Sequence, residues 1–220
     1  MGKVVLFGNK SAARETYNDL THFSDHEVVG FTVDREYLEE DTLFALPVVP
    51  FDEVVSVFPP DRYQMLIAVG YVAVNRLRAE RYLQAKSKGY QLLSFVSPRA
   101  TTYPGLDLGD NCRISHNCVI FQDAKIGNDV AIGAGTTIGH EVIIGDHCFL
   151  SSGVGVSGGV TVGPYCFLGT NATIRNRIHI GRECVIGAGA LVLEDVADRS
   201  VCLGTAAELL PISSEKLSPP

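Results

Sequence analysis

An aliphatic residue stands at every sixth position of the second half of the chain, without interruption, from Leu108 to Val192. Fifteen consecutive positions obey this rule, and glycine follows nine of them. This period matches neither the 3.6-residue repeat of an amphipathic helix nor the two-residue alternation of strands in a meander. It is typical of a parallel β-helix, in which three hexads close each triangular coil.

In such a coil the aliphatic residue points into the prism, and fifteen hexads make five coils. At a strand spacing of roughly 4.8 Å the prism is on the order of 24 Å tall. We expect the residue that follows each aliphatic position to need a permissive backbone, which glycine supplies.

The six cysteines share one phase of the repeat, and five of them precede an aliphatic position by two residues. They are Cys112, Cys118, Cys148, Cys166, Cys184 and Cys202. Six cysteines in a short secreted chain would indicate a disulfide framework. Their common phase instead predicts a small apolar slot in each corner, where cysteine acts as a compact hydrophobe. Buried thiols of this kind are not expected to be nucleophiles.

The first hundred residues alternate between strand-like and helix-like segments. Strands are expected over residues 3–7, 26–33, 47–50, 65–69 and 91–96, and helices over 12–20 and 75–88. The alternation predicts a small parallel α/β sheet. We therefore divide the chain into a Rossmann-like domain (1–100), a β-helix (101–204) and a C-terminal tail (205–220). The charged helix over 75–88 is expected to present a solvated face.

Ligands of open parallel sheets bind beyond the carboxyl ends of the strands. The residues at those ends are expected to form the rim of a binding pocket for substrate. They are Gly8, Asn9, Lys10, Ser11, Asp34, Gly70 and Tyr71.

The composition excludes several other classes of protein. A formal charge of −7 and a pI near 5.3 argue against a nucleic-acid or anionic-membrane surface. No apolar run approaches the roughly 20 residues that cross a bilayer, so membrane insertion is not expected. No leader precedes the first strand, which makes a cytoplasmic location the expectation.

The repeat over residues 102–204 resembles the hexapeptide-repeat, left-handed β-helix acyltransferases. A half-Rossmann unit ahead of such a prism resembles the NeuD/PglD-type sugar acyltransferases in particular. The resemblance implies a homotrimer with acyl-CoA, in the first place acetyl-CoA, in the groove between neighbouring prisms. It also implies N-acylation of a nucleotide-linked amino sugar for bacterial surface glycans such as the O-antigen of lipopolysaccharide. O-acetylation of a sialic-acid hydroxyl is the alternative.

This chain departs from the family at the first turn, where the glycine-rich loop that approaches the nucleotide-sugar keeps only Gly8. Lys10 and Ser11 are expected to contact a phosphate through their side chains instead. Asp34, which corresponds to the acidic residue after the second strand of the family, is expected to hold a base or ribose.

His140 and Glu141 resemble the catalytic pair of the family. The inward residues Ile138 and Ile144 bracket His140, so its side chain should project outward near a corner. The resemblance implies that His140 is the general base and that Glu141 orients its imidazole. The second histidine of the family, nine residues further on, is replaced by Phe149.

Two further histidines lie close to this pair in the repeat. His116 has the same hexad offset as His140 and is expected to approach the sugar from another face of the prism. His147 is out of phase with both and is expected on the surface.

Coenzyme A binding in this family uses backbone groups of successive coils, for which Gly158, Thr170 and Ala188 are the candidates, together with Phe149. The Gly158 N–H is the expected donor to the oxyanion of the tetrahedral intermediate. Arg175, Arg177 and Arg182 are candidates for the phosphates of coenzyme A.

Two other classes of protein use similar prisms. A γ-carbonic-anhydrase-like protein would stack histidine ligands one coil apart, and no pair of histidines in the prism has that spacing, so no metal is expected. A non-catalytic scaffold is the third reading, and the His140–Glu141 pair argues against it.

Overall fold

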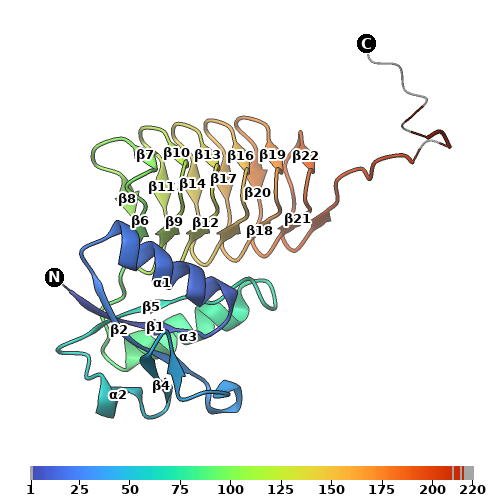
Figure 1. Ribbon diagram of the computed structural model, residues 1–220. Helices are drawn as coiled ribbons and strands as arrows, with labels where there is room; N and C mark the ends of the chain where they lie inside the picture. The colour runs from blue at the N-terminus through green and yellow to red at the C-terminus, as the bar shows by residue number, and fades with distance from the viewer. Residues whose placement is uncertain (1, 210, 214, 216–220) are drawn as a thin grey trace.

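The structure is a computed structural model that describes residues 2–209, 211–213 and 215. It contains an N-terminal α/β domain and a long triangular prism that lies above it in Figure 1. The tail expected over residues 205–220 includes positions outside the described residues. No helix among the described residues is long and apolar enough to cross a membrane.

The N-terminal domain is a five-stranded sheet in the order β3-β4-β2-β1-β5. The strands are parallel except for β3, which pairs antiparallel with β4. Its strands are β1 (Lys3–Phe7), β2 (Glu27–Val33), β3 (Thr42–Leu43), β4 (Leu46–Pro50) and β5 (Gln64–Ile67). Its helices are α1 (Ser11–Phe23), α2 (Val54–Val57), α3 (Arg76–Ser87) and a 3-10 turn at Arg35–Tyr37. The expected alternation is therefore present, with element ends shifted by a few residues.

The strand expected over residues 91–96 is divided between the two domains. Leu92 bridges Met65 beside the N-terminal sheet, whereas β6 (Phe95–Val96) pairs with β9 (Arg113–Ile114) in the prism. The chain thus enters the first coil with a strand that directly continues the N-terminal domain.

The prism is a left-handed parallel β-helix with three faces, each a stack of two-residue strands. Face 1 contains β6 (Phe95–Val96), β9 (Arg113–Ile114), β12 (Ala131–Ile132), β15 (Phe149–Leu150), β18 (Phe167–Leu168), β21 (Val185–Ile186) and β23 (Val201–Cys202). Face 2 contains β7 (Thr101–Thr102), β10 (Val119–Ile120), β13 (Thr137–Ile138), β16 (Gly155–Val156), β19 (Thr173–Ile174) and β22 (Leu191–Val192). Face 3 contains β8 (Asp107–Leu108), β11 (Lys125–Ile126), β14 (Ile143–Ile144), β17 (Thr161–Val162) and β20 (His179–Ile180). We name the edges by the faces that they join, in chain order: 1–2, 2–3 and 3–1.

The aliphatic positions fill the interior of the prism as the repeat predicts. Ile120, Ile138 and Ile174 are completely buried, and each pairs in register with its neighbour in the next coil. Full burial of one such side chain contributes about 1.5–3 kcal/mol. The stack of aliphatic layers therefore supplies the main stabilisation of the prism.

The glycine after an aliphatic position is predicted from the sequence to be needed for its permissive backbone, and this prediction is wrong. None of these nine glycines has a positive φ, and the left-handed residue of each corner lies two positions further on, for example Asn117 and Glu141. Glycine is needed for space: a Cβ at Gly139 would lie 2.5 Å from the backbone nitrogen of Gly158 in the next coil. The corners of successive coils therefore touch through their backbones.

The cysteines occupy the expected slots as free thiols. The Sγ–H groups of Cys112, Cys118 and Cys148 donate to carbonyls of the next coil at 3.0–3.2 Å. Burial raises the pKa of the Cys112 thiol to about 12 and also raises the pKa of Cys118. Such thiols stay protonated at neutral pH and make poor nucleophiles.

The N-terminal domain is joined to the prism by a buried polar network. Helix α3 presents the expected solvated face, with Arg76 and Glu80 exposed, but its charged residue Arg78 lies on the opposite, buried face. The Arg78 side chain is 2% exposed, and its Nε donates to Asp129 Oδ1 at 3.0 Å. Arg78 Nη2 donates to the carbonyls of Asp129 and Cys148, at 2.8 and 2.9 Å. Asn75, at the start of α3, donates from Nδ2 to the Cys166 carbonyl at 3.0 Å.

The expectation that His147 lies on the surface is also wrong. It is buried between Tyr82 and Tyr165, with its Nδ1 2.8 Å from Asp129 Oδ2. The other carboxylate oxygen accepts from Asn111 Nδ2 at 2.7 Å. Asp129 thus has three side-chain partners. They offset the cost of burying its charge, since a buried carboxylate is tolerated only when it is paired and hydrogen-bonded.

We predict that Arg78→Met lowers the free energy of unfolding by about 3–5 kcal/mol, because it leaves the Asp129 carboxylate buried without its cation. Arg76→Met is the matched control on the same helix. The Arg76 side chain is 67% exposed and pairs with Glu183 on the surface, so its loss should cost less than about 1 kcal/mol. Urea unfolding followed by circular dichroism measures both, and equal midpoints would contradict the prediction.

Candidate active site

His140 lies on edge 2–3, two residues after the end of β13. Its side chain is 58% exposed, as expected for a position outside the aliphatic register. The Gly159 N–H donates to the His140 carbonyl at 2.9 Å, which holds this corner against the next coil. The imidazole is therefore presented to solvent from a rigid backbone.

The imidazole lies directly against Gly158. A Cβ built at Gly158 would be 2.5 Å from His140 Nε2, closer than any real contact. Among the described residues no protein acceptor takes the Gly158 N–H. A basic nitrogen and a free amide thus stand side by side on the edge, the combination that acyl transfer requires.

Glu141 is the left-handed residue of the same corner, with φ 59°. Its Oε2 is 3.7 Å from His140 Nδ1, which is ion-pair distance and too long for a direct hydrogen bond. Both side chains are mostly exposed. The orienting role expected for Glu141 stays a prediction.

The three backbone candidates for coenzyme A do not lie on one edge. Gly158 shares edge 2–3 with His140, whereas Thr170 and Ala188 follow β18 and β21 on edge 1–2. Phe149 lies on face 1 in β15. Within one chain these residues therefore flank different sides of the prism.

His116 also lies on edge 1–2, away from His140. Its Nε2 is 3.2 Å from Asp19 Oδ1 of α1, and its Nδ1 is 2.7 Å from Ser97 Oγ. Phe23 of α1 packs edge-on against the ring. These partners link the prism to the N-terminal domain, and contact of His116 with a sugar stays a prediction.

The rim residues expected in the N-terminal domain do come together. A cavity of about 380 Å³ at the carboxyl ends of β1 and β5 is lined by Gly8, Asn9, Lys10, Ser11, Asp34 and Gly70. Gly8 has a φ of 123°, and a Cβ there would lie 2.8 Å from the Ala68 carbonyl oxygen. Only glycine fits this turn, which lets α1 begin at the cavity.

Two charged residues of this nucleotide-binding candidate already have partners. Lys10 Nζ is 2.7 Å from Glu39, and Asp34 Oδ2 is 2.9 Å from Arg81 Nη2. The backbone amides at the start of α1 have no intrahelical acceptor and carry the positive end of the helix dipole.

Tyr71 lines a second cavity, of about 200 Å³, between α1, α3 and face 1. Its ring packs against Phe149 and Phe167, with centroids 5.2 and 4.5 Å away. Arg78 and Arg113 line the same cavity. The sequence analysis missed Phe167 and Arg113, although both stand at the outward position directly before an aliphatic residue.

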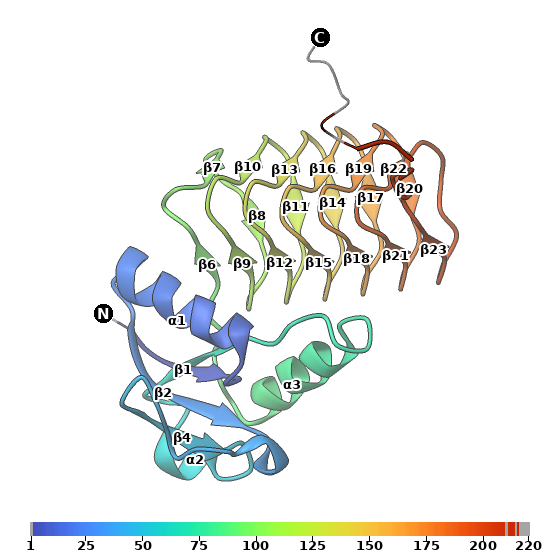
Figure 2. The ribbon, with the colours of Figure 1, turned by 45° about the vertical axis from the view of Figure 1, so that its right-hand side comes forward.

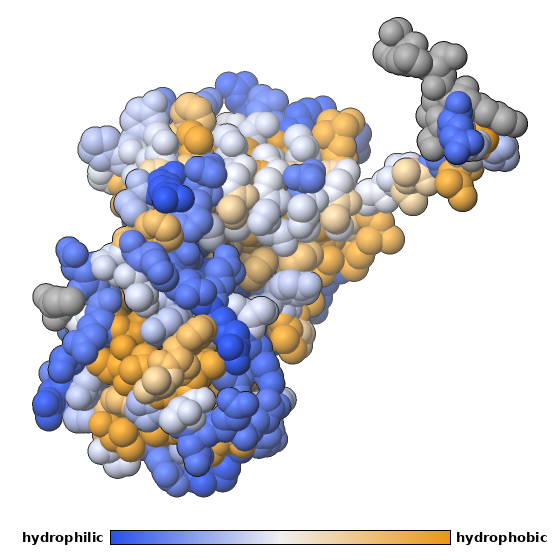
Figure 3. Space-filling model, in the orientation of Figure 1, coloured by the Kyte–Doolittle hydropathy of each residue, from blue (hydrophilic) through white to orange (hydrophobic). Residues whose placement is uncertain are grey.

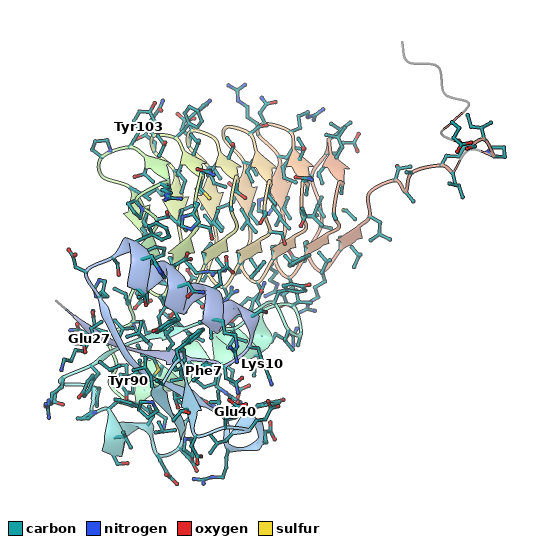
Figure 4. The ribbon with its side chains drawn as sticks, in the orientation of Figure 1. Phe7, Lys10, Glu27, Glu40, Tyr90 and Tyr103 are labelled. Carbon is teal, nitrogen blue, oxygen red and sulfur yellow. The ribbon has the colours of Figure 1, made fainter. Side chains whose placement is uncertain are left out.

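The cavities and His140 are on opposite sides of the molecule. In Figure 4, Phe7 and Lys10 mark the N-terminal cavity, and Tyr103 marks edge 2–3 at the far side of the prism. Figure 2 shows α1 and α3 beneath the face-1 strands. In Figure 3 hydrophobic residues gather over the centre of the N-terminal domain and below the C-terminal coils.

Residues 123–158 and 159–194 match the family model of the bacterial transferase hexapeptide (six repeats). No curated protein sequence matches the chain significantly. Among solved structures, a variant of perosamine N-acetyltransferase from Caulobacter crescentus, in complex with CoA and GDP-perosamine, superimposes with a TM-score of 0.84. It is 25% identical, and the match covers 93% of this chain and 94% of that one.

Two more distant structures share the whole fold. The acetyltransferase domain of PglB from Neisseria gonorrhoeae, in complex with acetyl coenzyme A, is 21% identical with a TM-score of 0.79, over 94% of this chain and 98% of that one. WeeI from Acinetobacter baumannii is 20% identical with a TM-score of 0.80, over 96% of this chain and all of that one.

Residues 123–194 thus carry the repeat of the bacterial hexapeptide transferases, and the chain has the fold of the perosamine N-acetyltransferase structure. An α/β domain followed by the prism is the architecture of these three structures, and the resemblance to sugar acyltransferases predicted from the sequence is confirmed.

We predict that Gly158→Ala displaces the His140 imidazole, because the new methyl group would occupy its position. Gly155→Ala, in the adjacent strand β16, is the matched control, since its Cβ would meet nothing closer than 3.9 Å. The chemical shifts of the His140 ring in NMR spectra report the displacement. Unchanged shifts in Gly158→Ala, with the variant folded, would contradict the contact.

Proposed function

We propose that the protein transfers an acetyl group from acetyl-CoA to the amine of a nucleotide-linked amino sugar, with His140 as general base. The observation that carries this proposal is the His140–Gly158 contact on the exposed edge of a prism that superimposes on perosamine N-acetyltransferase. That enzyme is described in complex with CoA and GDP-perosamine. The biological role that follows is synthesis of a bacterial surface glycan in the cytoplasm.

The reaction needs one base and one oxyanion donor. His140 Nε2 accepts a proton as the sugar nitrogen attacks the thioester carbonyl, forming the C–N bond. The Gly158 N–H donates to the oxyanion of the tetrahedral intermediate. When the C–S bond breaks, the imidazolium returns the proton to the departing sulfur, and coenzyme A leaves as the thiol. No acyl-enzyme forms, in accord with the buried, protonated cysteines.

The nucleotide-sugar is proposed to bind in the cavity at the end of β1. The amides at the start of α1 would receive the diphosphate, as helix N-termini commonly do. The sugar would then extend past Gly70 and Tyr71 toward face 1.

The active site is proposed to be completed by a second copy of the chain in a homotrimer. The opposite placement of the cavity and His140 within one chain supports this arrangement. It also accounts for the divided coenzyme A candidates: Gly158 on edge 2–3 of one copy would face Phe149, Thr170 and Ala188 of its neighbour. Acetyl-CoA would occupy the groove between them.

We predict that His140→Ala lowers kcat by at least about a hundredfold, the usual loss when a general base is removed. His179→Ala is the control, because His179 is an exposed histidine on face 3 of the same prism. Release of free thiol from acetyl-CoA measures both, with GDP-, UDP- and dTDP-linked 3-amino and 4-amino sugars and with free sialic acid. Full activity of His140→Ala would overturn the mechanism. Thiol release with sialic acid alone would assign a hydroxyl acceptor.

We predict a mass in solution of three times the 23.7 kDa chain, measured by light scattering at assay concentrations. A fully active species with the mass of one chain would show that a single copy contains the complete site. Mixed trimers of His140→Ala chains with chains lacking a functional cavity should recover part of the activity.

A further inference from the structure

Tyr103 and Phe121 form an exposed aromatic pair on edge 2–3. Their ring centroids are 6.2 Å apart with an interplanar angle of 25°, so the two rings are nearly parallel. Tyr103 is 47% exposed and Phe121 is 38% exposed. In Figure 4, Tyr103 lies at the outer side of the first coils, away from the N-terminal domain.

The register of face 2 places this pair next to His140. Strand β10 pairs with β7 on one side and with β13 on the other, so Tyr103, Phe121 and Gly139 follow one another on successive coils. The Phe121 N–H donates to the Ile138 carbonyl at 2.9 Å. Because coils are spaced by roughly 4.8 Å, the Phe121 ring starts one coil away from the residue that precedes His140.

The edge has a different chemistry on the other side of His140. The imidazole leans toward Gly158, and the coil beyond carries Arg175 and Arg177 at the same corner. The Arg177 side chain lies close to Gly159. Along the edge, the aromatic pair is therefore followed by His140, then by two glycines without side chains, and then by the two arginines. The arginine side suits the phosphate groups of the donor, which leaves the aromatic side for the acceptor.

We propose that Tyr103 and Phe121 bind the sugar ring of the acceptor through its apolar face and hold its amine beside His140 Nε2. This inference rests on the proposed function and names the acceptor subsite of the same active site. A pyranose ring presents C–H groups on one face, and an aromatic ring offers a rigid, flat surface with matching weak attraction. The platform favours deoxy sugars, whose methyl group adds apolar area.

The kinetic test compares Phe121→Ala with Phe121→Tyr, which keeps the ring. We expect Phe121→Ala to raise KM for the nucleotide-sugar about tenfold, with kcat within threefold and KM for acetyl-CoA unchanged. Phe121→Tyr should restore the wild-type KM. Equal KM values for all three proteins, or a rise in KM for acetyl-CoA alone, would overturn the proposal.

A binding test separates this inference from the proposed function, because it does not depend on turnover. The chain contains no tryptophan, so Phe121→Trp places a single indole in the platform. We expect the amino-sugar nucleotides of the panel to change its fluorescence, with GDP, UDP and dTDP as ligands that lack the sugar and leave it unchanged. Leu193→Trp is the matched control, at the equivalent corner position of the last coil, and should not respond.

The outcomes are distinct. A sugar-dependent signal without thiol release by the wild-type protein would support the platform and overturn the transfer reaction. Thiol release by the wild-type protein without a sugar-dependent signal would overturn the platform alone. If Phe121→Ala has a lower mass in solution than the wild-type protein, the aromatic pair is a contact between copies of the chain, and the proposal is wrong.

Discussion

The buried ion pair between Arg78 and Asp129 is the constraint on which the arrangement of the two domains depends. A carboxylate without accessible surface is tolerated only when its charge and its lone pairs are satisfied. Asp129 meets that requirement through Arg78 of α3 and through Asn111 and His147 from the neighbouring corners of the prism. Any rotation of the N-terminal domain would separate Arg78 from Asp129. The domain is therefore held against face 1 and edge 3–1, and the cavity at the carboxyl end of β1 is fixed in position relative to the coils.

The candidate catalytic residues lie on an edge of the prism. Its interior is filled by the aliphatic core, and its faces are formed by the stacked strands. Nine of the corners bring two coils close together at a glycine, and the chain then turns through a left-handed residue. Side chains next to that turn project outward from a rigid support, which suits a base such as His140. Along edge 2–3 the side chains differ in chemistry from coil to coil, from the aromatic pair through His140 and Gly158 to the arginines.

Much of this architecture follows from the sequence. The six-residue period predicts the coils, the buried aliphatic layers and the phase of the cysteines, because those properties depend only on local spacing. The pocket rim was predictable for the same reason: residues at the carboxyl ends of parallel strands must meet, and Gly8, Asp34 and Gly70 line one cavity. The outward position of His140 was predictable from Ile138 and Ile144, which bracket it.

The contacts between domains could not be predicted in this way. The charged helix α3 has the pattern of a solvated helix, and His147 has the pattern of a surface residue. Arg78 of α3 and His147 are nevertheless buried, because Asp129 at a corner of the prism lies opposite them. The periodicity of either segment does not indicate that partner. The division of the coenzyme A candidates between two edges, in contrast, follows from the repeat, because Gly158 and Thr170 are separated by two hexads.

The sequence by itself thus determined the repeat, the prism, the α/β domain ahead of it and the residues that face outward at the corners. Only the tertiary structure decided which of those residues are neighbours. Spacing along a chain sets the direction of a side chain, whereas proximity between distant segments depends on how whole faces and domains pack. For this protein that packing buries Arg78 of α3 against Asp129 of the prism and places the cavity at the end of β1 on the side of the molecule away from edge 2–3.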